Sequence, residues 1–410
     1  MVPVIVIPRK EIEKIKSAKG WILIHGRRKV GKTFIVKNFI KYDLYALVKR
    51  GGGALLEGGP LKGTDNYDQV VEIILKGLEE GKTVVVDEFQ RLSEEFIDSL
   101  QMHHPKGKLI LLGSSMHVAK EITSRKSPLL GLLSEVPLSL LSPIDIFYHL
   151  SRSIPTEQAL MLSPYLRDPW TLRYLNKDPK ETILNILEYS RSAIPALIGE
   201  VFLDEDRFLS NVYESIMRSI ASGKSTLKEV SDQLFSKKLI KASDPSLVRP
   251  YVKIMEDMDL IERIPLYDNK GNYYSIKSKI MELYFYIDEK YNIESRKTTI
   301  IKEVIDEKIP FHIQFFAGEL MAEILDGTFR YYMTKDFDID IVITKRNHPV
   351  LVGEVKWTKK LKQNHISTFL KNTEKFNCKK VLISRASFDT KDVEIITPSK
   401  LLEMIGPYHS

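Results

Sequence analysis

Short, uninterrupted apolar runs alternate with amphipathic stretches over the first 140 residues. Residues 21–24, 84–86 and 109–112 are each continuous apolar segments. Strands that are buried on both faces of a sheet have this continuous pattern, whereas strands with one face in solvent alternate. Because helical periodicity separates these runs, the segment is predicted to form a mostly parallel α/β sheet.

Three further patterns follow that segment. Residues 141–204 are mostly helical and are interrupted by prolines. Residues 205–296 have helical periodicity and then two extended runs around a turn at 268–271, which predicts helices followed by a hairpin. Residues 297–410 are predicted to form a second, smaller α/β unit, with its helix and strands at 315–325, 338–344, 350–357 and 379–385. The pattern therefore predicts a multidomain α/β protein with four parts, the first of which spans residues 1–140.

The strongest motif lies directly after the first apolar run. Residues 26–33 match G-x-x-x-x-G-K-[ST], the phosphate-binding loop. Lys32 would reach the β- and γ-phosphates of ATP, and Thr33 would bind Mg²⁺ through its hydroxyl. The loop residues expected to surround the phosphates with backbone N–H groups are Gly26, Arg27, Arg28, Lys29, Val30 and Gly31.

Two acidic residues end the second apolar run. A buried strand that ends in Asp87 and Glu88 carries both to the carboxyl edge of the sheet, where α/β proteins bind ligands. Asp87 is expected to hold Mg²⁺ and Glu88 to polarise the attacking water. The alternative is that the acids cap the following helix. At the end of the third run, Ser114 or Ser115 could sense the γ-phosphate, and a plain turn is the alternative.

Carboxylates and a lysine also gather in the predicted C-terminal strands. Glu354 and Lys356 lie two residues apart on one strand and so point to the same face. A hairpin would bring Asp340 beside Glu354, where two carboxylates could bind Mg²⁺ or Mn²⁺. Lys356 could then orient a water or stabilise developing charge, and Glu319 on the preceding helix could complete the metal site. The tripeptide E-x-K is common, and Asp338 competes with Asp340 because an offset of two keeps the same face.

Charge and composition indicate what the protein binds and where it is located. Lys and Arg number 61 and Asp and Glu 54, a net charge of +7. Residues 355–380 contain eight Lys and one Glu, which is also +7, so this segment equals the charge of the whole chain. A clustered basic face attracts phosphate backbones, which makes DNA an expected partner, and a solvated surface is the alternative.

The single cysteine, Cys378, fits a reducing cytoplasm, and no apolar run reaches the about 18 residues of a membrane span.

Residues 1–290 resemble the archaeal P-loop ATPases of the AAA+/STAND type. Besides the phosphate-binding loop and the acidic strand end, Pro8–Ile12 resembles the start of that family, which lies near the adenine. Ser192–Pro195 resembles the lid motif in which a small residue and Pro195 close over the base. Phe208–Ile287 resembles the winged helix that follows. The resemblance implies ATP binding and hydrolysis, a helical lid over 141–204 and a winged-helix domain over 205–296.

One departure from that family concerns assembly. Leu132 stands where members often carry an arginine that completes a neighbour's site. Without that arginine, hydrolysis in a ring is less expected than a slow nucleotide switch. The resemblance with this departure implies a monomer or a weak oligomer that binds ATP and ADP.

Residues 297–410 resemble the PD-(D/E)XK nucleases and the DUF234-type domain that often follows these archaeal ATPases. The resemblance rests on the order Glu319, Asp340 and then Glu354 with Lys356. It implies a restriction-endonuclease-like α/β domain. The sequence thus predicts an ATP-hydrolysing, DNA-binding protein with a metal-dependent nuclease-like C-terminal domain. The alternative is a slow nucleotide switch that binds DNA without cleaving it.

Overall fold

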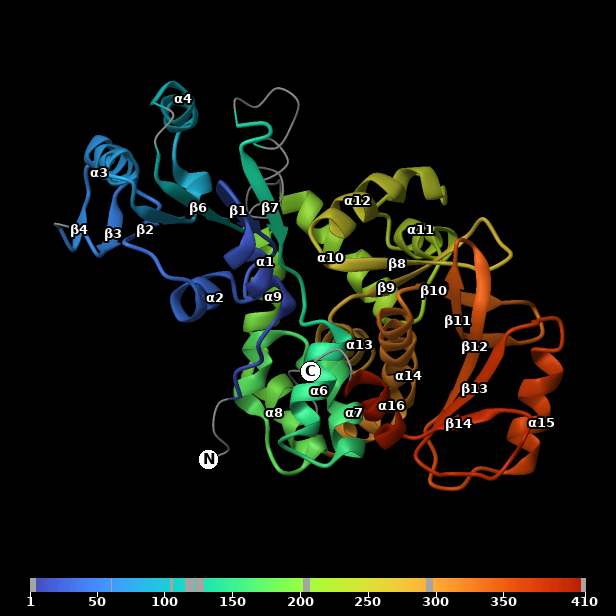
Figure 1. Cartoon of the computed structure of the whole chain (residues 1–410). Helices are drawn as coiled ribbons and strands as arrows, with labels where there is room; N and C mark the ends of the chain where they lie inside the picture. The colour runs from blue at the N-terminus through green and yellow to red at the C-terminus, as the bar shows by residue number, and fades with distance from the viewer. Residues whose placement is uncertain are drawn as a thin grey trace. The chain divides into compact units, whose positions relative to one another are not determined.

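The computed structural model describes most of the chain in two compact units. The first unit is Pro8–Leu140, and the second is Met1–Ile7 with Leu141–Ser410. The described residues are 5–59, 61–103, 106–114, 122, 129–201, 207–292 and 298–406. Figure 1 labels the helices and strands along the chain.

The first unit is built on a seven-stranded sheet in the order β4-β3-β2-β5-β6-β1-β7. The five parallel strands are β1 (Trp21–His25), β2 (Leu44–Val48), β5 (Thr83–Asp87), β6 (Lys108–Gly113) and β7 (Leu133–Pro137). At one edge, β3 (Ala54–Glu57) and β4 (Gly63–Thr64) pair antiparallel. The three apolar runs are β1, β5 and β6, which confirms the mostly parallel α/β sheet. The other four strands were not specified by the sequence pattern.

Helices cover both faces of this sheet. On one face α1 (Lys10–Ser17) and α2 (Lys32–Phe39) pack against alternate strand residues such as Ile22 and Val85. On the other, α3 (Tyr67–Glu79) and α4 (Glu94–His103) pack against Leu23 and Val84. Burial on both faces explains why the strands are apolar throughout. A short 3-10 helix, η1 (Phe89–Arg91), separates β5 from α4.

The second unit begins with a series of helices. Several prolines lie in the first turn of a helix, where the missing N–H costs nothing, so they begin helices rather than only interrupt them. The elements up to residue 291 are α6 (Pro143–Ser151), α7 (Thr156–Leu166), η2 (Pro169–Tyr174), α8 (Pro179–Tyr189), α9 (Ala193–Val201), α10 (Arg207–Ala221), α11 (Leu227–Ser236), α12 (Pro245–Asp257), β8 (Ile261–Pro265), β9 (Asn272–Ile276) and α13 (Lys279–Tyr291). The hairpin β8–β9 lies where two extended runs were expected.

The C-terminal part of the second unit is a five-stranded sheet in the order β10-β11-β12-β13-β14. β10, β11 and β12 are antiparallel, and β12, β13 and β14 are parallel. Helices α14 and α15 lie on opposite faces of this sheet (Figure 1). The elements are α14 (Thr298–Leu325), β10 (Thr328–Met333), β11 (Asp338–Lys345), β12 (His348–Lys356), α15 (Gln363–Asn372), β13 (Lys379–Ser384), β14 (Glu394–Ile396) and α16 (Pro398–Ile405).

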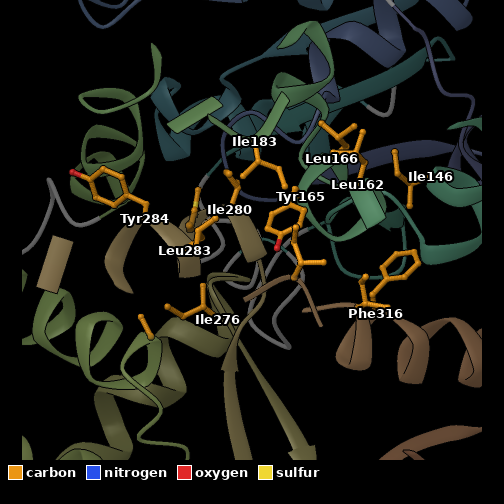
Figure 2. Close-up of a cluster of buried hydrophobic side chains, with 14 of the residues drawn as sticks. Ile146, Leu162, Tyr165, Leu166, Ile183, Ile276, Ile280, Leu283, Tyr284 and Phe316 are labelled. Carbon is orange, nitrogen blue, oxygen red and sulfur yellow. The ribbon is translucent and has the colours of Figure 1, made fainter. Parts of the chain in front are cut away.

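One hydrophobic cluster joins the helices of the second unit to its C-terminal sheet. Figure 2 shows part of it, with Ile146 from α6, Tyr165 from α7, Ile280 from α13 and Phe316 from α14. All four side chains are at most 1% exposed. The segments expected to form a lid and a winged helix therefore share a core with α14.

The hairpin also joins the edge of the C-terminal sheet. Leu266, just beyond β8, forms a bridge with Tyr331 of the edge strand β10. The Tyr267 N–H donates to the Tyr331 carbonyl at 2.8 Å, and Asp268 pairs with Lys375 at 2.8 Å. Backbone pairing at an otherwise open sheet edge fixes the hairpin in place.

Candidate functional site

The phosphate-binding loop connects β1 to α2 in the first unit. Gly26 has φ +154°, and a Cβ at this position would lie 2.0 Å from the Leu138 carbonyl oxygen, so only glycine fits. Gly31 has φ +95° and immediately precedes α2. No side chain caps this helix start, so the first-turn N–H groups of α2 remain open to an anion.

Arg9, which directly precedes α1, hydrogen-bonds the phosphate-binding loop. Its guanidinium donates to the Val30 carbonyl at 2.9 Å and to the carbonyls of Ser139 and Leu140 at 2.9 and 3.2 Å. Arg9 is 5% exposed. The segment Pro8–Ile12 thus contributes Arg9, whose hydrogen bonds link the phosphate-binding loop to the last residues of the first unit.

Lys32 lies inside the loop. Its ammonium donates to the carbonyls of Gly26 at 2.7 Å and Arg27 at 2.9 Å. Burial lowers the pKa of Lys32 to about 8, although Glu88 and Asp87 act to raise it. A phosphate group near this ammonium would favour its charged form, which burial disfavours.

Asp87 and Thr33 meet at the carboxyl end of β5. The Thr33 hydroxyl donates to Asp87 Oδ2 at 2.7 Å, and the Glu88 N–H donates to Asp87 Oδ1 at 2.9 Å. Tyr45 of β2 also donates its hydroxyl to Asp87 Oδ2. No pattern in the sequence pointed to Tyr45, because the pairing of β2 with β5 arises only when the sheet forms.

Glu88 adopts a left-handed backbone conformation with φ 59°. Residues other than glycine rarely take this conformation, and those that do are often found at functional sites. Its carboxylate does not cap η1. It accepts from Gln90 Nε2 at 2.9 Å and pairs with Arg91 at 3.0 Å. Gln90 also donates to Ser114 Oγ at 3.1 Å and so connects the ends of β5 and β6. Ser115 lies outside the described residues.

The sequence also relates Leu132 and Pro195 to the nucleotide. Leu132 is 40% exposed in the first unit and offers no charge. Pro195 lies in α9 of the second unit. Its expected contact with the adenine stays a prediction.

The C-terminal sheet brings Asp340, Glu354 and Lys356 together. Ile341 of β11 pairs with Gly353 of β12, which makes Asp340 and Glu354 neighbours across the strands. Asp340 Oδ2 accepts from the Val355 N–H at 2.8 Å, and Glu354 forms an ion pair with Lys356.

The two aspartates of β11 differ in exposure, since Asp340 is partly buried and Asp338 is exposed. Burial, with the nearby charges of Glu354 and Asp338, raises the pKa of Asp340 to about 7. A metal ion at Asp340 would therefore compete with a proton below that pH. Asp338 is exposed at the strand end and accepts from the Tyr331 hydroxyl.

The structure does not bring Glu319 to this pair. Glu319 of α14 forms an ion pair with Arg167 at 2.6 Å. α14 packs on the sheet face that carries Ile341 and Leu351, whereas Asp340 alternates with these residues and points away. Among the described residues, no group of three or more His, Cys, Asp or Glu is placed to hold a metal ion.

The basic segment 355–380 is partly neutralised. Lys356, Lys375 and Lys379 have acidic partners. Within the described part of the chain, no ion pair is found for four exposed lysines, Lys359, Lys360, Lys362 and Lys371. Arg385 stacks over the Trp357 ring at 5.4 Å, so one face of that indole is covered by protein.

None of the helices in the described ranges is long and apolar enough to span a membrane.

Comparisons with known proteins find structures with a similar fold. The chain is similar to a Walker-type ATPase of Pyrococcus abyssi, with 18% identity over 68% of this chain and 96% of that one and a TM-score of 0.50. It is also similar to the ORC2 protein of Aeropyrum pernix (12% identity, 75% and 95% coverage, TM-score 0.40). A third similar structure is a STAND protein of Pyrococcus horikoshii (18% identity, 79% and 54% coverage, TM-score 0.29). No curated protein matches the chain. Residues 18–140, which contain most of the parallel sheet and the G-x-x-x-x-G-K-[ST] loop, match the model of a family described as an AAA domain.

Proposed function

We propose that this protein hydrolyses ATP in its first unit and binds and cleaves DNA with its second unit. The observation that carries the cleavage proposal is the gathering of Asp340, Glu354 and Lys356 at the ends of two adjacent strands. A phosphate-binding loop in the same chain supports control of that activity by ATP.

Residues of the first unit fit ATP with Mg²⁺. The Thr33 hydroxyl and the Asp87 carboxylate offer oxygen ligands 2.7 Å apart, which suit this cation. Bound Mg²⁺ would neutralise charge on the phosphates. Lys32 would stabilise the charge that develops on the γ-phosphate, Glu88 would orient the attacking water, and Ser114 would contact the γ-phosphate.

Residues of the C-terminal sheet fit phosphodiester hydrolysis. The adjacent carboxylates of Asp340 and Glu354 would hold a Mg²⁺ or Mn²⁺ ion, which activates a water and polarises the phosphate when bound. Lys356, released from Glu354, would orient the water or stabilise charge on the phosphate oxygens.

Lys356→Ala is expected to lower metal-dependent cleavage by at least about 100-fold, because it removes the cation that pairs with Glu354. The assay would use plasmid and single-stranded DNA with Mg²⁺ or Mn²⁺, with and without ATP. Lys345→Ala, at the other end of β11, is the matched control and should cleave like the wild type. Cleavage that persists in Lys356→Ala would place the catalytic centre elsewhere.

A second candidate function is a nucleotide-controlled protein that binds DNA without cutting it. Two observations favour it: the pairing of Glu319 with Arg167, and an apolar residue at position 132. This candidate expects no cleavage with any divalent ion while DNA binding persists.

DNA binding is proposed to use α11 and α12 as the helix pair of a winged helix. Lys238, Lys241 and Arg249 are exposed in the turn between these helices and on α12. The hairpin β8–β9 would be the wing, but its pairing with β10 leaves it less free to follow a DNA groove.

Replacing Lys238, Lys241 and Arg249 together with alanine is expected to weaken binding to duplex DNA and to reduce the slope of log K against log salt by about 2–3, one for each lost phosphate contact. Fluorescence anisotropy over a range of salt concentrations measures both. Lys270→Ala, in the hairpin turn, should leave affinity and slope unchanged. The opposite pattern would assign DNA contact to the hairpin.

A further inference from the structure

Tyr45 lies where it can control the orientation of Asp87. In the register of the sheet Tyr45 of β2 is opposite Val85 of β5, and Asp87 follows two residues later on the same face. The ring is 2% exposed and packs among residues beneath α1 and α2. From there its hydroxyl donates to Asp87 Oδ2.

Asp87 receives a donor on each oxygen. Oδ1 accepts from the Glu88 N–H, and Oδ2 accepts from both Thr33 and Tyr45. Because a hydroxyl has one proton and two lone pairs, Thr33 keeps its lone pairs available to a cation while it donates to Asp87. The orientation of those lone pairs depends on where Asp87 Oδ2 is held.

The position of Tyr45 is itself fixed. The Lys37 ammonium lies 4.5 Å from the ring centroid and pairs with Glu57 at 2.7 Å. Tyr42 donates to the same Glu57 at 3.2 Å, and its ring centroid is 5.5 Å from that of Tyr45. The contacts with Lys37 and Tyr42 therefore hold the Tyr45 ring in the position from which its hydroxyl reaches Asp87.

We propose that Tyr45 is a positioning residue of the Mg²⁺ site, which holds Asp87 so that the Thr33 hydroxyl presents its lone pairs to the metal. The inference rests on the roles proposed above for Thr33 and Asp87. Residues that hydrogen-bond a metal-binding carboxylate typically change metal affinity about 10-fold or more when removed.

The test is a Mg²⁺ titration of the affinity for a fluorescent ADP analogue. Tyr45→Phe removes only the hydroxyl and is expected to raise the Mg²⁺ concentration for half-maximal effect by about 10-fold. Affinity without Mg²⁺ should stay within about two-fold of the wild type, because the phosphate-binding loop is untouched. Tyr67→Phe, which removes a hydroxyl bonded to Ser93 in the same unit, is the matched control and should behave as the wild type.

A double-mutant cycle separates positioning from general stability. In an Asp87→Ala background, Tyr45→Phe should have no further effect on the Mg²⁺ titration, because the acceptor of the Tyr45 hydroxyl is gone. A Tyr45→Phe protein that titrates like the wild type, that loses affinity equally without Mg²⁺, or that fails to fold would overturn the inference.

Thr33→Ala distinguishes failure of this inference from failure of the proposed site. If ADP affinity responds to Mg²⁺ in the wild type and in Tyr45→Phe alike but not in Thr33→Ala, only the role of Tyr45 is wrong. If Thr33→Ala retains the full response to Mg²⁺, the proposed metal site is wrong as well.

Discussion

Replacement of Lys32 with alanine is expected to reduce ATP hydrolysis by at least about 100-fold, the scale seen when a preorganised charge-stabilising donor is removed. Lys32 is 8% exposed and lies against the carbonyls of the loop that would hold the phosphates. Its loss removes the cation that would stabilise charge on the γ-phosphate. Steady-state release of phosphate from ATP measures the effect.

Lys41→Ala is the matched control for Lys32→Ala. Lys41 is an exposed lysine just after α2. Its substitution should leave hydrolysis within about two-fold of the wild type, as for most exposed positions away from a site. Hydrolysis at the wild-type rate in Lys32→Ala would show that the loop of residues 26–33 does not perform the reaction.

The second large effect is expected at a buried charge cluster in the second unit. Lys279 is 2% exposed, and its ammonium lies 3.2 Å from Glu262 and 3.1 Å from Glu282. Burial acts to raise the pKa of Glu282, yet Lys279 and His312 lower it to about 2. The lysine therefore compensates a buried carboxylate, that of Glu282, and a partly buried one, that of Glu262.

Lys279→Met is expected to destabilise the protein by about 3–5 kcal/mol, because it leaves buried carboxylates without their cation. Urea unfolding at neutral pH measures the change. Lys277→Met is the matched control, since Lys277 pairs with Asp259 in a more exposed position and should lose only about 0–1 kcal/mol. Equal losses for the two variants would show that the cluster adds little beyond a surface ion pair.

This cluster connects segments that are far apart in the sequence. Glu262 precedes the hairpin turn, Lys279 begins α13, and Glu319 of α14 pairs with Arg167 just after α7. Burial and the nearby Glu319 raise the pKa of Glu262 to about 7. Together with the shared hydrophobic core, these contacts make the helices after residue 141 and α14 one compact unit.

The sequence alone determined the features that depend on neighbours along the chain. The phosphate-binding loop requires Gly26 and Gly31 at fixed spacing, because the backbone must turn closely around an anion. Three parallel strands followed from continuous apolar runs, and the pairing of Asp340 with Glu354 followed from two strands joined by a short turn. In each case the contact is local or needs only one hairpin.

Only the tertiary structure decided which distant side chains meet. Tyr45 and Asp87 are 42 residues apart, and Arg167 and Glu319 are 152 apart, so no periodicity along the chain relates them. The order of strands in the sheet places Tyr45 beside Asp87. The packing of α14 against the opposite sheet face turns Glu319 away from Asp340. Such contacts depend on how whole elements pack, and a linear pattern of apolar and polar residues specifies which face is buried but not against which partner.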